Sequence, residues 1–367
     1  MQVEKTGVVG AGLMGKDISG MLANAGYSVV LVDVDPDALE DAREFHETKL
    51  EDELRDAGIL KDESPAERIT YDTDTSALEG AGFVVEAVPE SLELKRNIVA
   101  DLEEILEDDA VIATNTSSLT AGEIAEGAEH PERVVLFHFA NPAIHRNIVE
   151  YSGDNASDEA LQTAREVGEA IEKEPFRLHS EHRANCLSRL SASIKCSATW
   201  ELLEAEPAAI DVAANRVGFD RGPLELIDLI GLDVHLDTVD NLAVEYGDTY
   251  APPDKVRERM GKMVADGRLG KKSGEGFFVW EGDEAVVPEP DEPHDIMPIL
   301  AALVNEAHRL VADGVGDEET VNEILKRGGD SEMGPFDVEE MFGTDSLRET
   351  LEERHEETGA SIYEPVF

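Results

Sequence analysis

The sequence is poor in cysteine, in basic residues and in long apolar runs, and each scarcity excludes a class of protein. It holds two cysteines, Cys186 and Cys196. On one helix these thiols would lie about 15 Å apart, at roughly 1.5 Å per residue, which is too far for a disulfide. Two thiols without a disulfide framework are typical of a reducing compartment, so we expect a cytoplasmic protein.

Basic residues are greatly outnumbered by acidic ones. The chain has 31 Lys and Arg against 82 Asp and Glu, which gives a formal net charge of −51. This excludes the binding of nucleic acid through a general basic surface, because phosphate contacts need clustered Lys and Arg. It also argues against attraction to anionic membranes. Because salt screens self-repulsion, we interpret the acidic excess as a halophilic adaptation.

Signals for membrane insertion and export are missing as well. No apolar run reaches the roughly 20 residues that a membrane-spanning helix needs. Residues 1–5 lead directly into a strand-like segment without the pattern of a signal peptide. We therefore expect a chain that is neither inserted in a membrane nor secreted.

The first half of the chain alternates strand-like and helix-like segments, which predicts an α/β fold of the Rossmann type with a doubly wound parallel sheet. The expected strands cover residues 8–9, 27–34, 83–88, 110–114 and 134–139. The expected helices between and after them cover residues 37–57, 92–106, 119–125 and 158–171.

Beyond about residue 183 the strand patterns stop and helices are expected over residues 187–203, 208–217, 224–230 and 234–246. Residues 281–295 are rich in proline and acidic residues and are predicted to form a linker.

The chain then repeats itself. Gly222-Pro223, Gly231, Asp233, Gly247 and Pro253 recur at a constant offset of 112 residues as Gly334-Pro335, Gly343, Asp345, Gly359 and Pro365. Six matches at one offset indicate a duplicated helical domain whose two copies pack together, because small helical units often cannot bury their apolar faces alone. We place the α/β domain at residues 1–183, the helical domain at 184–290 and its second copy at 291–367.

A glycine-rich segment in the first strand–helix turn predicts a dinucleotide site. It reads Gly10, Ala11, Gly12, Leu13, Met14 and Gly15, and Asp33 ends the next strand 18 residues after Gly15. The glycines allow a tight turn and close approach of the backbone to a pyrophosphate, which the helix N-terminus then holds. An acid at position 33 accepts from the ribose 2′-hydroxyl and repels a 2′-phosphate, so the cofactor expected is NAD rather than NADP. FAD is the alternative with the same fingerprint.

Polar residues at buried-strand ends form a candidate catalytic group. Thr114–Ser118, His138 and Glu150 all fall at such ends, where ligands bind in a doubly wound sheet. A histidine beside a carboxylate suits the dehydrogenation of an alcohol, because the imidazole takes the hydroxyl proton as hydride leaves. The spacing alone does not establish that His138 and Glu150 meet, and a structural role for the histidine stays open.

Eight motifs, in order over about residues 5 to 280, resemble the L-3-hydroxyacyl-CoA dehydrogenases. They are Gly10–Gly15, Glu86-Ala87-Val88-Pro89-Glu90 with Lys95, Thr114–Ser118, His138-Phe139 with Asn141-Pro142, Val149-Glu150, Arg221–Pro223, Asp228–Asp233 and Gly270–Phe277. The C-terminal duplication resembles the long multifunctional members and their archaeal relatives.

The resemblance implies NAD-dependent oxidation of (S)-3-hydroxyacyl-CoA in fatty-acid β-oxidation. It implies His138 as general base, Glu150 as its partner, and Ser117 as a contact to both substrate and cofactor. The residues that match family positions lining the NAD site are Glu90, Lys95, Asn141 and Lys272. It further implies an acyl-CoA substrate and a separate hydratase or thiolase as partner. The second helical copy would replace a dimer partner, which predicts a monomer with an internal pseudo-dimer, or a homodimer.

Three positions depart from the family pattern. Ser188 stands where the family has an asparagine that hydrogen-bonds substrate, and we expect Asn185, one turn earlier, or a water on Ser188 to supply that donor. Ala140 replaces a usual phenylalanine and widens the expected pocket. Asp17 replaces a usual glycine, and we expect it to cap and solvate the start of the cofactor helix.

Cations that could bind the phosphates of CoA are scarce. Lys49, Arg55, Lys61 and Arg68 lie in the helical segment after the second strand, with Lys49 and Lys61 as the candidate substrate contacts. Ordinary ion pairs on a charged helix are the competing interpretation for each.

Two other functions compete with CoA-linked dehydrogenation. One is a dehydrogenase of the same fold acting on a free hydroxy acid such as L-gulonate or carnitine. The other is an NAD-binding partner of β-oxidation enzymes without turnover. His179, His182 and Cys186 lack a fourth ligand at suitable spacing, so no metal is expected.

Overall fold

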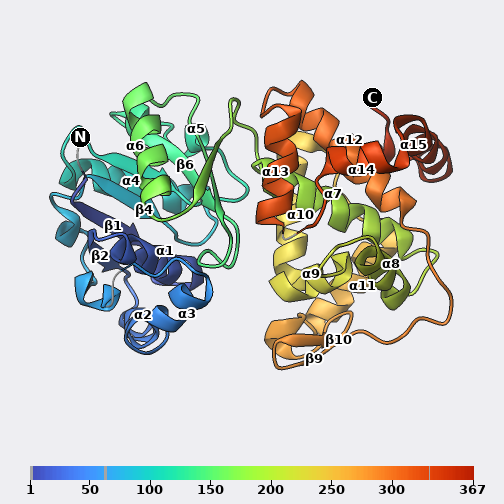
Figure 1. Cartoon of the computed structure of the whole chain (residues 1–367), viewed down its shortest axis with the longest axis horizontal. Helices are drawn as coiled ribbons and strands as arrows, with labels where there is room; N and C mark the ends of the chain where they lie inside the picture. Colours follow the sequence, from blue (N-terminus) through green and yellow to red (C-terminus); the bar gives the residue numbers. More distant parts are fainter. Residues whose placement is uncertain (1–2, 62–63, 330) are drawn as a thin grey trace. The chain divides into compact units, whose positions relative to one another are not determined.

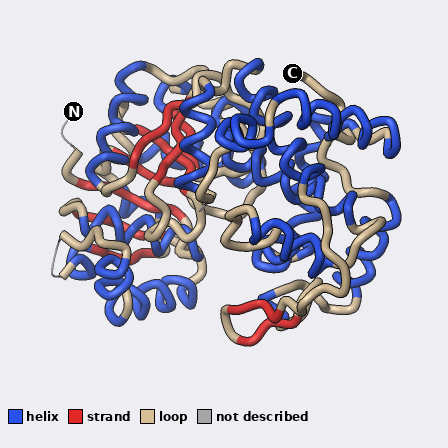
Figure 2. Tube along the Cα trace, turned by 45° about the vertical axis from the view of Figure 1, so that its right-hand side comes forward, coloured by secondary structure: helices blue, strands red, loops and turns tan. Residues whose placement is uncertain are grey.

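The computed structural model describes residues 3–61, 64–329 and 331–367. The chain divides into two compact units, Met1–Asn185 and Cys186–Phe367 (Figure 1). The first unit is an α/β sandwich, and the second consists almost entirely of helices (Figure 2).

An eight-stranded sheet forms the centre of the first unit, in the order β3-β2-β1-β4-β5-β6-β7-β8. Its strands are β1 (Lys5–Val9), β2 (Ser28–Val32), β3 (Ile69–Asp72), β4 (Phe83–Glu86), β5 (Val111–Thr114), β6 (Val134–Phe139), β7 (Ile148–Ser152) and β8 (Glu174–Arg177). The Rossmann-type prediction is confirmed. The sheet is not parallel throughout, however, because β7 pairs antiparallel with β6.

The helices of this unit are α1 (Leu13–Asn24), α2 (Pro36–Thr48), α3 (Leu50–Asp56), α4 (Leu92–Ile105), α5 (Ala121–Ile124) and α6 (Asp158–Ala170).

The prediction of one helix over residues 37–57 is wrong, because the helix is interrupted at Lys49, which has φ −128° and ψ −30°. Leu50 and Leu54, after the break, are fully buried. The predicted helix over 119–125 is shorter, since a capping box on Thr120 begins α5 at Ala121.

Nine helices make up most of the described part of the second unit. They are α7 (Cys186–Glu201), α8 (Pro207–Arg216), α9 (Pro223–Ile230), α10 (Leu232–Tyr246), α11 (Asp254–Ala265), α12 (Met297–Ala312), α13 (Glu318–Gly328), α14 (Pro335–Phe342) and α15 (Thr344–Thr358). Both cysteines lie on α7, where they are buried thiols.

A small hairpin corrects the prediction that residues 281–295 are a linker throughout and that strands end before residue 183. Strands β9 (Val279–Glu281) and β10 (Glu284–Val286) pair antiparallel. Gly282 makes the turn with φ +65°, a conformation that glycine adopts at no steric cost. The Trp280 indole is buried and donates to Asp228 at 3.3 Å, which anchors the hairpin.

The predicted duplication is present, since α7 to α10 recur in order as α12 to α15. The same contact recurs with it: Asp211 accepts from two backbone N–H groups at the start of α9, and Asn322 does so at the start of α14. The copies pack against each other as expected. Buried Arg189 on α7 pairs with buried Glu306 on α12 at 2.7 Å.

Among the residues described, none of the helices has the length and apolar character needed to cross a bilayer.

Candidate active site

The glycine-rich turn between β1 and α1 has the shape that its sequence predicts. Gly10 has φ +104°, and a Cβ there would lie 2.6 Å from the carbonyl oxygen of Ala87. A Cβ on Gly15 would lie 1.7 Å from the carbonyl oxygen of Gly10, whereas one on Gly12 would meet nothing within 4 Å. Gly10 and Gly15 therefore close the turn, and Gly12 leaves an open approach to the backbone.

The start of α1 fits a dinucleotide phosphate. No side chain caps the helix, and its first turn carries no acidic residue, so its N–H groups and dipole are available to an anion. Asp33, directly after β2, accepts from the Ala11 N–H at 2.7 Å and from the Asp35 N–H at 2.9 Å. The carboxylate thus fixes the turn while keeping lone pairs for ribose hydroxyls. Leu13 and Met14 belong to the first turn of α1, and Leu13 is exposed.

Glu90 organises the loop that carries Ser117. One of its carboxylate oxygens accepts from the Thr116 hydroxyl at 2.5 Å and from the backbone and hydroxyl of Ser118, both at 2.8 Å. It also accepts from the Ser117 N–H at 3.1 Å. Burial raises the pKa of Glu90, but Lys95 and these donors outweigh it and hold the pKa below its ordinary value. The Ser117 side chain is left exposed at the end of β5.

Lys95 is buried beneath this loop. Its ammonium donates to both carboxylate oxygens of Glu86, at 2.8 and 3.1 Å, and lies 3.4 Å from Glu90. Lys95 is 1% exposed and Glu86 is fully buried. The structure therefore places Lys95 as the counter-ion of two carboxylates. Glu86 is part of the motif Glu86–Glu90, but no role was predicted for it, although an acid at the end of the apolar run Phe83-Val84-Val85 is a signal for one.

His138 and Glu150 lie opposite each other in the register of β6 and β7. The Nδ1 atom of His138 is 2.8 Å from Oε2 of Glu150, with Glu150 fully buried and His138 7% exposed. Placing Glu150 at a carboxyl strand end was wrong, because β7 runs antiparallel and Glu150 lies in its middle. That reversal is what brings the two side chains together.

Asn115 connects β6 to the Ser117 loop. Its side-chain oxygen accepts from the Phe139 N–H at 3.0 Å, one residue after His138. The loop after β5 and the histidine strand are thereby held to each other at the carboxyl edge of the sheet. Asn141, two residues further on, is exposed.

The remaining predicted residues lie apart from this group or in the second unit. Asn185 ends the first unit and donates to the Thr116 carbonyl at 3.3 Å. Lys49 is exposed at the junction of α2 and α3, and Lys61 pairs with Glu172 and donates to the Ala170 carbonyl. In the second unit Ser188 is half-buried on α7 and Lys272 pairs with Asp233.

Asp17 is not the solvated cap that the sequence predicts. It lies in the second turn of α1 and is only 5% exposed. Burial is the largest cause that raises its pKa, to about 6.

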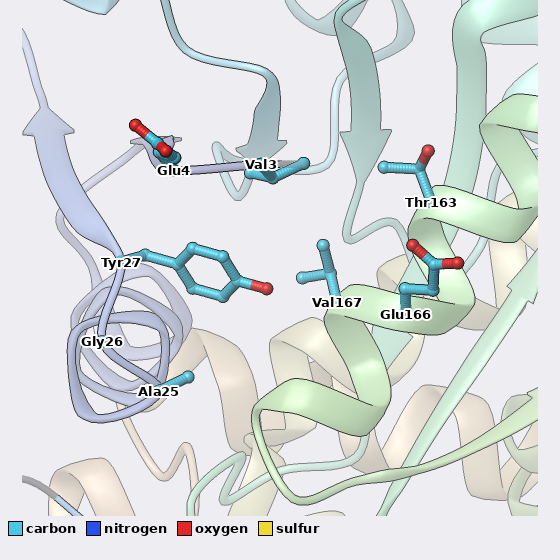
Figure 3. A pocket seen from close by; sticks show the side chains of 8 residues that line it. All are labelled: Val3, Glu4, Ala25, Gly26, Tyr27, Thr163, Glu166 and Val167. Carbon is cyan, nitrogen blue, oxygen red and sulfur yellow. The ribbon is translucent and has the colours of Figure 1, made fainter. Parts of the chain in front are cut away.

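The first unit also holds a cavity of about 550 Å³ away from this edge (Figure 3). It is lined by residues at the amino end of β1 and β2 and on α6, among them Tyr27 and Glu166. No residue predicted for the site lines it, so it is distinct from the group around His138.

Comparison with known proteins gives two family matches that together cover most of the chain. Residues 5–181 match the family profile described as "3-hydroxyacyl-CoA dehydrogenase, NAD binding domain". Residues 187–280 and 297–367 both match "3-hydroxyacyl-CoA dehydrogenase, C-terminal domain".

Named relatives agree with these matches. A 3-hydroxyadipyl-CoA dehydrogenase of Escherichia coli is 34% identical over 78% of this chain and 61% of its own length. A fatty acid oxidation complex subunit alpha of Vibrio parahaemolyticus is 30% identical over 96% of this chain and 52% of its own. The chain thus spans about half to three-fifths of the length of these curated relatives.

A solved structure extends the agreement to the whole fold. The crystal structure of 3-hydroxybutyryl-CoA dehydrogenase from Escherichia coli superposes with a TM-score of 0.85 at 26% identity, covering 100% of this chain and 97% of that one. With the dinucleotide turn, the His138–Glu150 pair and both family profiles in place, the chain belongs to the 3-hydroxyacyl-CoA dehydrogenase family of NAD-dependent oxidoreductases, with NAD as its cofactor.

Proposed function

We propose that this chain oxidises (S)-3-hydroxyacyl-CoA to 3-oxoacyl-CoA in fatty-acid β-oxidation, with His138 as general base. The observation that carries the proposal is the 2.8 Å contact between His138 Nδ1 and Glu150 Oε2 at the carboxyl edge of the sheet. The substrate class follows the relatives, which are named 3-hydroxyadipyl-CoA and 3-hydroxybutyryl-CoA dehydrogenases.

Glu150 fixes the role of each ring nitrogen of His138. A proton on Nδ1 is held by the buried carboxylate, which leaves Nε2 as the atom that accepts the hydroxyl proton of the substrate. Glu150 then stabilises the imidazolium that forms. The Gly10–Gly15 turn would hold NAD, which would supply the acceptor for the hydride on the carbon that bears this hydroxyl.

Ser117 and Asn185 are proposed to orient the substrate. Ser117 is exposed on a loop that Glu90 fixes through four hydrogen bonds, so its hydroxyl is presented by a rigid backbone. Asn185 uses one amide hydrogen on the Thr116 carbonyl and keeps a second for substrate, in place of the donor that Ser188 lacks.

Of the two lysines proposed for CoA phosphates, Lys49 is the better candidate. Lys61 already pairs with Glu172 and with a backbone carbonyl, whereas Lys49 is exposed and has no recorded ion pair among the described residues.

Further proposals concern the domain bounds, the oligomeric state and the partner enzymes of this chain. We propose domain bounds of 1–183, 184–290 and 291–367, and that the second helical copy replaces a dimer partner within one chain. A monomer and a homodimer then differ twofold in particle mass. A separate hydratase or thiolase would supply substrate or consume product in a salt-rich cytoplasm.

The test of the proposed function is NADH oxidation with acetoacetyl-CoA at high salt, comparing the unmodified chain with His138→Gln. Loss of the general base is expected to lower kcat by about 100-fold or more, because positioned proton transfer contributes that much. NADH binding, measured by fluorescence, is expected to stay within about twofold, since His138 is not part of the dinucleotide turn.

Three results would contradict this. Equal rates in both proteins would remove His138 from the reaction. Turnover of a free hydroxy acid without CoA would favour the alternative dehydrogenase, and NADH binding without any turnover would favour a non-catalytic partner.

A further inference from the structure

Basic residues are concentrated in one segment of this strongly acidic chain. Residues 255–272 hold seven of the 31 Lys and Arg but only two of the 82 Asp and Glu. The segment consists of α11 and the loop that follows it, in the second unit (Figure 1). Because cations are scarce in the chain as a whole, their concentration here indicates a local use for positive charge.

Three of these seven cations neutralise acids from outside the segment. The acids belong to α10 and to the turn between β9 and β10. The pairs are Arg257 with Asp240, Lys271 with Asp283 and Lys272 with Asp233, at 2.6 to 2.7 Å. Four cations of the segment remain to be explained.

These four cations line a single cavity of about 330 Å³, here called the α11 cavity. Lys255, Arg259 and Lys262 follow one another at spacings of four and three residues on α11, which places them on one face of the helix. Arg268 lines the same cavity from the loop after the helix. Cations from two elements thus meet around one concave surface.

The α11 cavity also has two carboxylates and an apolar part. Glu258 and Asp266 line it, together with the buried side chain of Met263. Glu258 pairs with Lys262 at 3.0 Å. Four cations against two carboxylates leave an excess of two positive charges, so the lining suits an anion with at least two negative charges.

The two guanidinium groups of the cavity are held in place and still have donors to offer. The Arg259 guanidinium lies 5.7 Å from the centroid of the Phe277 ring, in a cation–π contact. Arg268 donates to the Gly276 carbonyl at 2.7 Å and pairs with Glu275 at 3.0 Å. Because a guanidinium has five N–H donors, each of them keeps donors for a ligand.

Lys255 and Arg259 are the cations of the cavity that remain available. Both are exposed, and among the described residues no acid pairs with either. We propose that the α11 cavity binds a phosphate-bearing anion with two or more negative charges, of the kind found in the diphosphate group of a nucleotide. Arginine binds phosphate oxygens through paired hydrogen bonds, and lysine adds positive charge. A cavity of this size takes a small anion, whereas the surface of a second protein would need a broad face.

Two sources can supply this anion: the nucleotide part of CoA, or a free phosphate compound. The Gly10–Gly15 turn, where NAD is expected, belongs to the other unit of the chain. The α11 cavity is also independent of the proposed reaction, because its ligand can be measured without turnover.

Titration calorimetry with inorganic pyrophosphate tests the site. NADH is kept saturating, so that the Gly10–Gly15 turn is occupied, and KCl is kept at the lowest concentration at which circular dichroism shows a folded chain. The unmodified chain is expected to bind one pyrophosphate. The double variant Lys255→Gln with Arg259→Gln is expected to bind it about tenfold more weakly or worse, because hydrogen bonds between charged groups contribute that much.

Arg257→Gln is the matched control. It removes an arginine from the same helix, two residues before Arg259, but Arg257 pairs with Asp240 and does not line the cavity. Its Kd for pyrophosphate is expected to stay within about twofold of the unmodified chain, since salt screens a charge outside the site. Equal weakening in the control and the double variant would overturn the proposal, as would an unmodified chain that does not bind pyrophosphate.

A titration with CoA under the same conditions identifies the source of the anion. The part of CoA binding that the double variant removes is compared with the binding of pyrophosphate. Tighter binding of CoA supports the nucleotide part of CoA as the ligand, and equal affinity supports a free phosphate compound. If the double variant keeps its affinity for pyrophosphate but changes its mass in light scattering, the cations contact a second protein and the anion site is wrong.

Discussion

At the scale of single residues, several of the few cations of this chain lie beside buried carboxylates. Lys95 forms ion pairs with Glu86 and Glu90. Lys173 lies near Asp17, and Arg189 forms an ion pair with Glu306. In a chain with 31 basic and 82 acidic residues, placing cations in the interior leaves the surface strongly acidic. Lys173 also donates to two carbonyls of the loop after β6, and Lys95 pairs with Glu90, which fixes the loop of Ser117.

Removing the ammonium of Lys95 is expected to be strongly destabilising. Lys95→Met leaves Glu86 buried without a counter-ion, which typically costs about 3–5 kcal/mol of the free energy of unfolding. Urea denaturation at constant salt measures the change. The double variant K95M/E86Q removes both charges and is expected to recover much of the loss, and a double variant as unstable as K95M would contradict the buried-charge explanation.

Much of the site could be predicted from residue identity, and the pairing within it could not. The glycine turn and Asp33 follow from local sequence, because their roles depend on backbone conformation near them. That His138 meets Glu150 depends on β7 running antiparallel to β6. Residue identity does not show this, and the signal for it was the length of the connection, which is shorter than the dozen or so residues that a parallel crossover needs. Asp17 is only 5% exposed because of tertiary packing, which residue type does not show, so its type alone suggested an exposed cap.

At the scale of elements, the differences between prediction and structure arise where tertiary packing decides an element's ends. The periodicity of residues 37–57 is continuous, with buried positions at helical spacing up to Leu54, yet the helix breaks at Lys49, and nothing in that periodicity shows the break. The acidic segment after Val279 was predicted to be a linker, yet it begins with a hairpin. The buried Trp280 indole of this hairpin donates a hydrogen bond to Asp228. Long amphipathic helices such as α4 and α6 were predicted correctly, since their periodicity matches their burial.

The starts of α9 and α14 offer a natural comparison of two caps. Asp211 accepts from the N–H groups of Leu224 and Glu225 at 3.0 and 2.8 Å, and Asn322 accepts from those of Phe336 and Asp337 at 3.0 and 3.4 Å. Burial raises the pKa of Asp211 to about 7, with neighbouring carboxylates adding to the effect. Its folded pKa lies above the unfolded value, so its contribution to stability is lost as pH rises towards 7.

Asp211→Asn is therefore expected to increase the free energy of unfolding by about 1 kcal/mol or more at alkaline pH and to give little gain at about pH 4, close to the unfolded pKa of 3.8. Urea denaturation at the two pH values measures this. The reciprocal change, Asn322→Asp, is expected to lower stability at alkaline pH. If D211N were destabilising at both pH values, the carboxylate would be the better cap and the comparison would fail.

At the scale of the whole molecule, net charge is the dominant property. With a formal charge of −51, the folded chain repels itself, and the repulsion extends about 10 Å at 0.1 M salt but only about 3 Å at 1 M. The sequence predicts this repulsion without any knowledge of the fold, because it depends on composition.

We expect the Tm to rise by roughly 5 °C or more between about 0.1 and 1 M KCl, since compaction of a highly charged chain is favoured as its charges are screened. Calorimetry at constant pH measures it. Sucrose of equal osmolality, which does not screen charge, serves as the control and should give a smaller rise. A Tm independent of KCl would remove the basis for the halophilic interpretation.

The Arg189–Glu306 pair between the two helical copies has a further consequence for how this chain can change. Helices α7 and α12 correspond at an offset of 111 residues. Lys195 in the first copy is therefore equivalent to Glu306 in the second, and Arg189 in the first copy is equivalent to Leu300 in the second. In a symmetric dimer every contact occurs twice and each substitution is felt on both sides of the axis. Here the ion pair occurs once, and its counterpart positions carry a leucine and a lysine. A substitution in one helical copy of this chain therefore changes one place only. The two copies can accumulate different substitutions, and one of them can lose motifs that the other keeps.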